Sequence, residues 1–352
     1  MTSVLAPHPD PAIQAVGPRP HRALSVLFWA LWAVTALAGA AVMATSRDIA
    51  EESAVKALVL WVPLLALTLL FLRWLGPDQV QAASGVARTS RRRLTLLVLA
   101  VVVPLCAAGL LGPVVLVPLT VGAGVAMVVW RHDVRRAELP VAAGFGALAA
   151  LGGTANWFAT GQTADLLFAL FMFPVVTLSL LAGWAAGRRA GWAGTPVGRT
   201  LVVADGWKTA LKTFGFGALV AIPWALGNIA NGPDGGDPMT TWWQPSSTLM
   251  FGVAEEAWAR VLLIGVLFLL FRRVAQAHTA LLTAALVATY WFAFVHMPIN
   301  PVGTAIMGTV FVMPMTYLYL RRGLEAAIGF HICANLVKFT AAYLITADLW
   351  FR

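Results

Sequence analysis

The stretch "FGVAEEAWARVLL", residues 251–263, places three ionisable side chains inside an apolar run. Two adjacent carboxylates, Glu255 and Glu256, precede Arg260, and the run continues through "IGVLFLLF" to Phe271. A run of this length is typical of a membrane-spanning helix, which needs roughly 20 mostly apolar residues. A charge at mid-membrane costs from about 3 to over 10 kcal/mol, so such charges are usually paired and functional.

The composition of the whole chain agrees with a membrane protein. The 352 residues are 60% hydrophobic and only 11% charged, whereas a soluble globular protein is about one quarter charged. Ala, Leu, Val and Gly dominate with little alternation, which excludes an outer-membrane barrel. We therefore predict an all-α, polytopic transmembrane helical bundle of about 10–11 spans. The apolar windows are 24–45, 55–72, 94–111, 114–130, 139–158, 165–186, 213–230, 246–271, 279–297, 302–320 and 324–346.

The net charge of +9 comes from arginines in short loops between these windows. Every second loop is basic, which is the positive-inside pattern. It predicts a multi-pass protein of the plasma membrane with a cytoplasmic N-terminus, and with an extracytoplasmic C-terminus if the number of spans is odd. The basic surface is expected to contact anionic membrane lipid and no nucleic acid.

Polar residues divide the chain unevenly. Residues 1–22 are Pro-rich and polar, which predicts a disordered cytoplasmic tail. Residues 23–190 form an accessory N-terminal transmembrane bundle with almost no buried charge. Residues 191–212 are expected to be a linker and an interfacial helix that carries Lys208 and Lys212. The intramembrane polar residues concentrate in 213–352, so the chemistry is expected there.

Three polar clusters lie in this last part. Glu256 and Arg260 are four residues apart on one helix face and can pair, whereas Glu255 points about 100° away and lacks a partner at helical spacing. His296 ends the aromatic run "YWFAFVHMP" (290–298), and "GFHICANLVKF" (329–339) places His331 and Asn335 on one face. Each cluster alone fits a structural ion pair, a structural histidine or interhelical hydrogen bonding. Together they supply a base, a proton shuttle or metal ligand, and oxyanion donors.

The expected topology raises a difficulty of depth. It places Glu255 and His296 in the outer half of the membrane and His331 nearer the inner end of its span. A gap of about 10 Å would then separate them along the helix axes. Tilt or a broken helix would be needed to close this gap; otherwise the span boundaries are misplaced.

The three clusters resemble the motifs of a known family. Glu255-Glu256-Ala-Trp-Ala-Arg260 fits EExxxR, Phe292-Ala-Phe-Val-His296 fits FxxxH, and His331-Ile-Cys-Ala-Asn335 fits HxxxN. These are the motifs, in order, of the CPBP intramembrane proteases, also called the CAAX protease or Abi family. The resemblance covers about residues 213–346 and says little about the first bundle.

The resemblance implies an endopeptidase that cuts a membrane-associated peptide, such as a CAAX-like or lipidated one. Glu255, with His296, would activate water, and Glu256 would pair with Arg260. His331 and Asn335 would stabilise the oxyanion. In a metalloprotease version of the scheme, Glu255, His296 and His331 would instead hold zinc, a His₂Glu set with one position open for water. No HExxH sequence supports the metal, so we favour water activated by the carboxylate.

Two other functions fit the same residues. Intramembrane Glu, His and Arg also build the proton relays of ion-coupled transporters, although the first half of the chain shows no repeat of the polar pattern. A non-catalytic bacteriocin-immunity or adaptor membrane protein could keep such a site as a binding cleft. The three complete motifs favour the enzyme.

Overall fold

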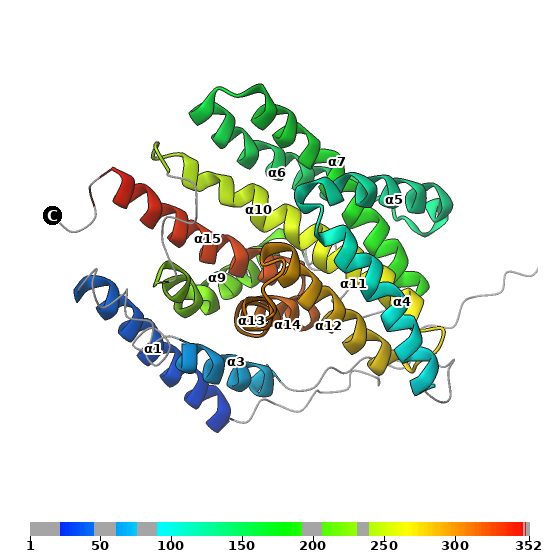
Figure 1. Cartoon of the computed structure of the whole chain (residues 1–352), viewed down its shortest axis with the longest axis horizontal. Coiled ribbons are helices and arrows are strands. Elements are labelled where there is room, and N and C mark those ends of the chain that lie inside the picture. Colours follow the sequence, from blue (N-terminus) through cyan, green and yellow to red (C-terminus); the bar gives the residue numbers. More distant parts are fainter. Residues whose placement is uncertain are drawn as a thin grey trace, which may run out of the picture.

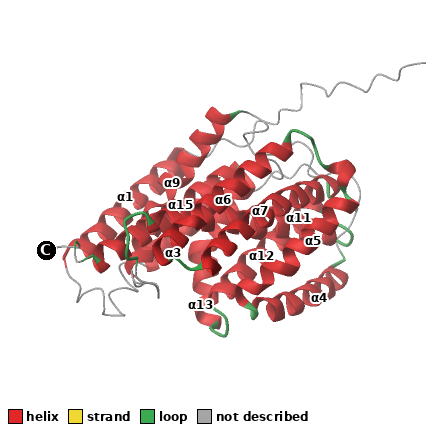
Figure 2. Ribbon diagram, turned by 90° about the horizontal axis from the view of Figure 1, so that it is seen from above, coloured by secondary structure: helices red, strands yellow, loops and turns green. Residues whose placement is uncertain are grey.

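The computed structural model describes residues 22–45, 61–75, 90–191, 206–230, 239–347 and 349. Within these ranges every regular element is a helix, as Figures 1 and 2 show. The predicted all-α class is confirmed. The predicted disordered tail, apart from Arg22, and most of the predicted linker lie outside the described residues.

The described helices form two groups along the chain. The first group is α1 (Arg22–Thr45), α3 (Val62–Leu75), α4 (Arg91–Gly109), η3 (Gly112–Val115), α5 (Leu116–Val129), α6 (Glu138–Thr160), α7 (Thr163–Arg189) and α9 (Trp207–Ala230). The second group is α10 (Thr248–Glu255), η6 (Glu256–Leu262), α11 (Leu263–Phe271), α12 (Ala277–His296), α13 (Pro301–Ile306), η7 (Met307–Val312), α14 (Met313–Arg322) and α15 (Leu324–Thr346).

A helix lies at each of the apolar windows found in the sequence. Among the described residues, eight helices are long and apolar enough to cross a membrane. The chain is thus a multi-pass membrane protein. The helices α3 and α5 are shorter, at 14 residues each. The window at 246–271 is filled by α10, η6 and α11, which continue one another.

The helix α9 differs from the expected interfacial segment. It runs unbroken from Trp207, so that Lys208 and Lys212 belong to the first two turns of a spanning helix rather than to a separate element. Both lysines are exposed. The residues from Trp207 to Phe214 include no glycine or proline, and therefore nothing ends the helix before the apolar window begins.

Two of the long helices contain π-helical turns. The turns η6 and η7 interrupt the α-helices on either side of them. Turns of this kind bond i to i+5 and occur frequently at functional sites. In η7 the carbonyl of Val310 accepts hydrogen bonds from Trp224 Nε1 at 2.7 Å and from Thr68 Oγ1 at 3.4 Å. The turn η6 carries Glu256 and Arg260.

The helices α1 to α7 contact α9 and the helices after it on different sides. α1 lies beside α9 and α3 beside α14, whereas α4 lies beside α12 and α6 beside α10 (Figure 1). The helix α7 also lies beside η6. The contact of α7 with η6 is very close, because a Cβ at Gly183 would overlap the carbonyl group of Val261. The division into an accessory bundle and a protease domain remains a prediction.

Candidate active site

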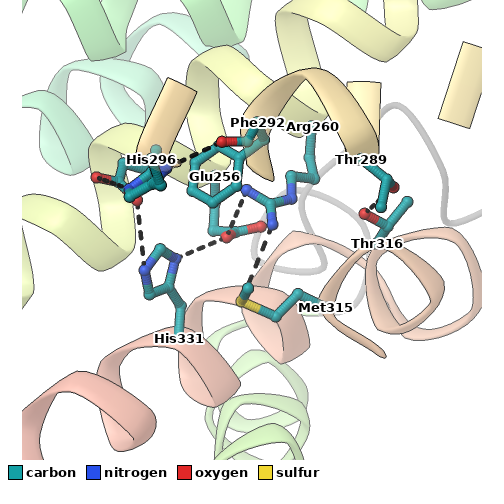
Figure 3. A network of polar contacts seen from close by, with 9 residues as sticks. Glu256, Arg260, Thr289, Phe292, His296, Met315, Thr316 and His331 are labelled. Carbon is teal, nitrogen blue, oxygen red and sulfur yellow. Dashed lines mark hydrogen bonds and ion pairs between the residues drawn. The ribbon is translucent and has the colours of Figure 1, made fainter. Parts of the chain in front are cut away.

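Glu255 is the last residue of α10, and its side chain is 17% exposed. Its two carboxylate oxygens face two different imidazoles, which come from α12 and α15. Oε1 lies 3.7 Å from His296 Nε2, and Oε2 lies 3.4 Å from His331 Nε2. These separations are longer than a direct hydrogen bond. Figure 3 labels both histidines, which project from different helices. The carboxylate that lacked a partner at helical spacing thus finds two partners on other helices.

Both imidazoles are fixed through their other nitrogen. His296 Nδ1 lies 2.9 Å from the carbonyl oxygen of Phe292, and His331 Nδ1 lies 2.8 Å from Glu256 Oε1. A carbonyl and a carboxylate only accept hydrogen bonds, so each Nδ1 is assigned the proton. In the neutral rings Nε2 then carries the lone pair and points at Glu255. Two proton acceptors are therefore turned towards one carboxylate.

Glu256 and Arg260 form the ion pair expected from their spacing. The distance from Glu256 Oε1 to Arg260 Nη1 is 3.2 Å, and the two side chains are 0% and 1% exposed. The guanidinium also lies over the ring of Phe292, with 4.3 Å from its carbon to the ring centroid. Its Nη2 faces Met315 Sδ at 3.9 Å. Because Glu256 also holds His331, the pair supports the imidazole as well as itself.

Phe292 is a residue to which the sequence analysis gave no role. Its ring centroid is 4.4 Å from that of His296, and its carbonyl accepts the His296 Nδ1–H bond. The same ring contacts Arg260. Its place four residues before His296, at the head of the FxxxH motif, was the available indication. Phe292 thus contacts both the arginine and the histidine.

Asn335 stands apart from these contacts. It lies one turn after His331 on α15 and is half-buried. Its side chain forms no hydrogen bond with any residue that the structure describes. The other site residues predicted from sequence are brought together by the fold, so Asn335 is the one whose amide is left available.

The expected gap in depth is closed by close packing between α10 and α15. A Cβ at Gly252 would overlap the Ile332 side chain and would lie 3.2 Å from the Ile332 nitrogen. This contact sets Glu255 and Glu256 level with His331 along the two helices. The expected topology separates Glu255 from His331 by about 10 Å in depth, whereas their side chains lie 3.4 Å apart in the structure.

With this geometry in view, residues 237–337 match the family model described as type II CAAX prenyl endopeptidase Rce1-like. The segment is Rce1-like. All three motifs lie within it, so the resemblance to the CAAX proteases is confirmed over this part of the chain. No curated protein and no solved structure matches the chain. The match supports an intramembrane CAAX-type protease in general. It does not assign roles to single residues.

A cavity of about 240 Å³ opens beside the carboxylate of Glu255. Glu255 and His296 lie in its wall, and neither Glu256 nor Arg260 lines it. The remaining lining residues are apolar or glycine. A ligand in the cavity would therefore meet Glu255 and His296 as its polar partners.

In the zinc alternative, Glu255, His296 and His331 would be the metal ligands. Among the residues that the structure describes, no group of three or more His, Cys, Asp or Glu side chains could hold a metal ion. The two oxygens of Glu255 face separate imidazoles, and His331 is bonded to a second carboxylate. The arrangement of these side chains does not fit a zinc site.

Proposed function

We propose that this protein is an intramembrane endopeptidase in which Glu255 activates water. The observation that carries the proposal is that the carboxylate lies in the wall of an apolar cavity with an imidazole Nε2 facing each of its oxygens, at 3.7 and 3.4 Å. A positioned base and a proton shuttle are the parts that hydrolysis of an amide needs. The Rce1-like match supports the same reaction class.

The reaction can be followed atom by atom. Glu255 accepts a proton as the water oxygen attacks the carbonyl carbon of the substrate. His296, held at Nδ1 by the Phe292 carbonyl, presents Nε2 to carry that proton to the leaving nitrogen. The C–N bond then breaks and leaves a carboxylic acid and an amine. The oxyanion is assigned to His331 and Asn335, as the resemblance implies.

The charges of the cluster favour uptake of this proton. Glu255 and Glu256 carry two negative charges and Arg260 carries one positive charge, so the cluster is singly negative when both imidazoles are neutral. Glu256 and Arg260 are fully buried, where an unbalanced charge is costly. The proton taken from water makes the cluster neutral. Glu256 and Arg260 therefore act as a fixed pair that holds His331, while Glu255 exchanges protons.

The substrate is proposed to be a membrane-associated peptide, CAAX-like or otherwise lipidated, that reaches the site from the surrounding lipid. The protein is proposed to lie in the plasma membrane with a cytoplasmic N-terminus, because arginines gather in alternate loops of the sequence.

The test replaces the base. Purified Glu255→Gln and Glu255→Ala variants are assayed on fluorogenic lipidated peptides in detergent, beside Asp165→Asn, which alters a carboxylate at the start of α7. We expect both Glu255 variants to fold and to lose turnover, because glutamine keeps the shape and removes the base, while Asp165→Asn stays active. Wild-type rates in Glu255→Gln would refute the mechanism. A transporter or a non-catalytic adaptor would leave the peptides intact even in the wild-type protein.

A further inference from the structure

The turn between α4 and α5 consists only of apolar residues and glycine. Its sequence, residues 109–115, is GLLGPVV. Three of its side chains are exposed, Leu110 at 58%, Leu111 at 57% and Val114 at 63%. An exposed patch of apolar side chains marks a surface that contacts something other than water. The turn therefore differs from an ordinary aqueous loop, which is rich in polar residues.

A second apolar turn joins α12 to α13 and follows His296 directly. Ile299 at its tip is 87% exposed and has a φ of 67°. This conformation is an outlier for a β-branched residue, whereas glycine or asparagine adopts it with little strain. Met297 and Val302 beside it are also exposed, at 40% and 67%. An apolar side chain in such a strained, exposed position is expected where the surroundings are themselves apolar.

The two turns lie close together beside the candidate active site. Gly112 of the first turn and His296 line the same cavity as Glu255. At the end of α4, a Cβ at Gly109 would lie 3.1 Å from the ring of Phe294 on α12. The exposed side chains of both turns thus border the same part of the molecule.

Polar backbone groups of both turns form hydrogen bonds within the chain. The first two N–H groups after α4 donate to carbonyls of that helix, at 3.2 and 3.0 Å. In the second turn the Met297 carbonyl accepts from the Thr304 hydroxyl at 3.0 Å and from the Asn300 N–H at 3.3 Å. The Asn300 side chain accepts from the Gly303 N–H at 2.8 Å. Hydrocarbon offers no hydrogen-bond partner, so backbone that lies in it must be satisfied internally in this way.

The α4–α5 turn does not reach the level of the turn between α6 and α7. That turn is polar, since residues 160–165 read TGQTAD, and α7 begins within it at Thr163. Phe168 and Met172 of α7 line the cavity together with Gly112. They lie about 8 and 14 Å along α7 from Thr163, at 1.5 Å per residue. The helix α5, at 14 residues, is about 21 Å long and falls short of the hydrocarbon thickness of about 30 Å.

We propose that α4 and α5 form a re-entrant hairpin whose turn, together with the α12–α13 turn, contacts the acyl chains of the lipid bilayer. Exposed arginines mark both ends of the hairpin: Arg91, Arg92 and Arg93 at the start of α4, and Arg131, Arg135 and Arg136 after the end of α5. The hairpin enters and leaves the membrane on this basic side, and its turn ends in the hydrocarbon. On the side of these two turns, the candidate active site is bordered by lipid chains rather than by water.

The experiment measures the surroundings of single residues by spin-label EPR in lipid vesicles. A background with Cys106→Ala and Cys333→Ala receives one new cysteine, as Leu111→Cys, Ile299→Cys or, for control, Gln162→Cys in the exposed polar turn. Each labelled protein is placed in phosphatidylcholine and phosphatidylglycerol vesicles that contain a nickel chelate on both sides. Oxygen dissolves in hydrocarbon and the chelate stays in water. We expect the labels at Leu111 and Ile299 to collide more with oxygen, and the control label to collide more with nickel.

Two other results would overturn the proposal. Greater contact with nickel than with oxygen at Leu111 would place the turn in water, and the hairpin would then cross the membrane. Little contact with either reagent would mean that protein, such as a second copy of the chain, covers the turns. The variants Val114→Cys and Val302→Cys repeat the measurement once in each turn, in case one label disturbs the fold. None of these results depends on turnover, so the proposal stands or falls separately from the proposed function.

Discussion

The guanidinium carbon of Arg260 lies 4.3 Å from the ring centroid of Phe292. This contact joins two motifs that stand on different helices. The arginine pairs with Glu256 in η6, and the phenylalanine carbonyl orients His296 on α12. Glu256 also binds His331 on α15. The side chains of Glu256 and Arg260 together therefore contact residues of all three motifs.

The first prediction concerns this ring. Phe292→Leu keeps an apolar side chain but removes the aromatic face under Arg260, whose interaction in a desolvated site is worth about 2 kcal/mol. Phe330→Leu is the matched control, because Phe330 is equally buried at 1% exposure and its ring lies against Trp224. The free energy of unfolding in mixed micelles should fall further for Phe292→Leu. Equal losses would show that the cation contributes nothing measurable.

The second prediction concerns the buried ion pair. Arg260→Met should lower the free energy of unfolding by about 3–5 kcal/mol, because it leaves Glu256 charged and poorly compensated in a dry site. Adding Glu256→Gln to Arg260→Met should recover part of this loss, since the amide is neutral and its oxygen can still accept from His331 Nδ1. Thermal stability and turnover are measured together. Full stability with lost turnover would instead place Arg260 in the chemistry.

The third prediction concerns the contact between α7 and η6. Gly183→Ala would force a methyl group into the backbone of Val261, and overpacking of this kind typically costs about 1–3 kcal/mol. Gly144→Ala in α6 is the control, because a Cβ at this position would meet nothing within 4 Å. Gly144→Ala should be neutral or slightly stabilising, since alanine has a higher helix propensity than glycine. If both variants unfold alike, the close contact does not position α7.

The sequence predicted the parts of the site that depend on spacing along one helix. The Glu256–Arg260 pair followed from an i, i+4 separation, and this pair is present. The meeting of Glu255 with His296 and His331 could not be derived from spacing, because it depends on how three helices are shifted along their axes. The chemistry of the three clusters and the resemblance to a family indicated it.

Other features had no local signature. The π-helical turn at Glu256 lies in an apolar sequence that reads equally well as a plain α-helix. The shift of α10 against α15 depends on Gly252 meeting Ile332, two residues that are 80 positions apart. The cavity wall from η3 and α7 depends on tertiary packing in the same way, and its residues look like ordinary core or lipid-facing positions.

The fourth prediction separates His331 from Asn335. The side chain of His331 contacts Glu255 and Glu256, whereas that of Asn335 bonds to no other residue in the described part of the chain. His331→Ala should therefore lower both stability and turnover, and Asn335→Ala should leave stability unchanged. If the amide stabilises the oxyanion, Asn335→Ala should still lose on the order of 10²–10³ in kcat.

The kinetic constants decide between the possible roles of these two residues. The KM of Asn335→Ala should barely change, because the carbonyl oxygen needs the amide only when it becomes an oxyanion. The double variant should lose less than the product of the single losses, as groups that share one task do. Elemental analysis adds an independent outcome, since a zinc-dependent enzyme would lose metal in His331→Ala and keep it in Asn335→Ala. Turnover at the wild-type rate in Asn335→Ala would show that the amide has no part in the mechanism, whatever the metal content. The oxyanion would then have to be stabilised by His331 and the backbone alone.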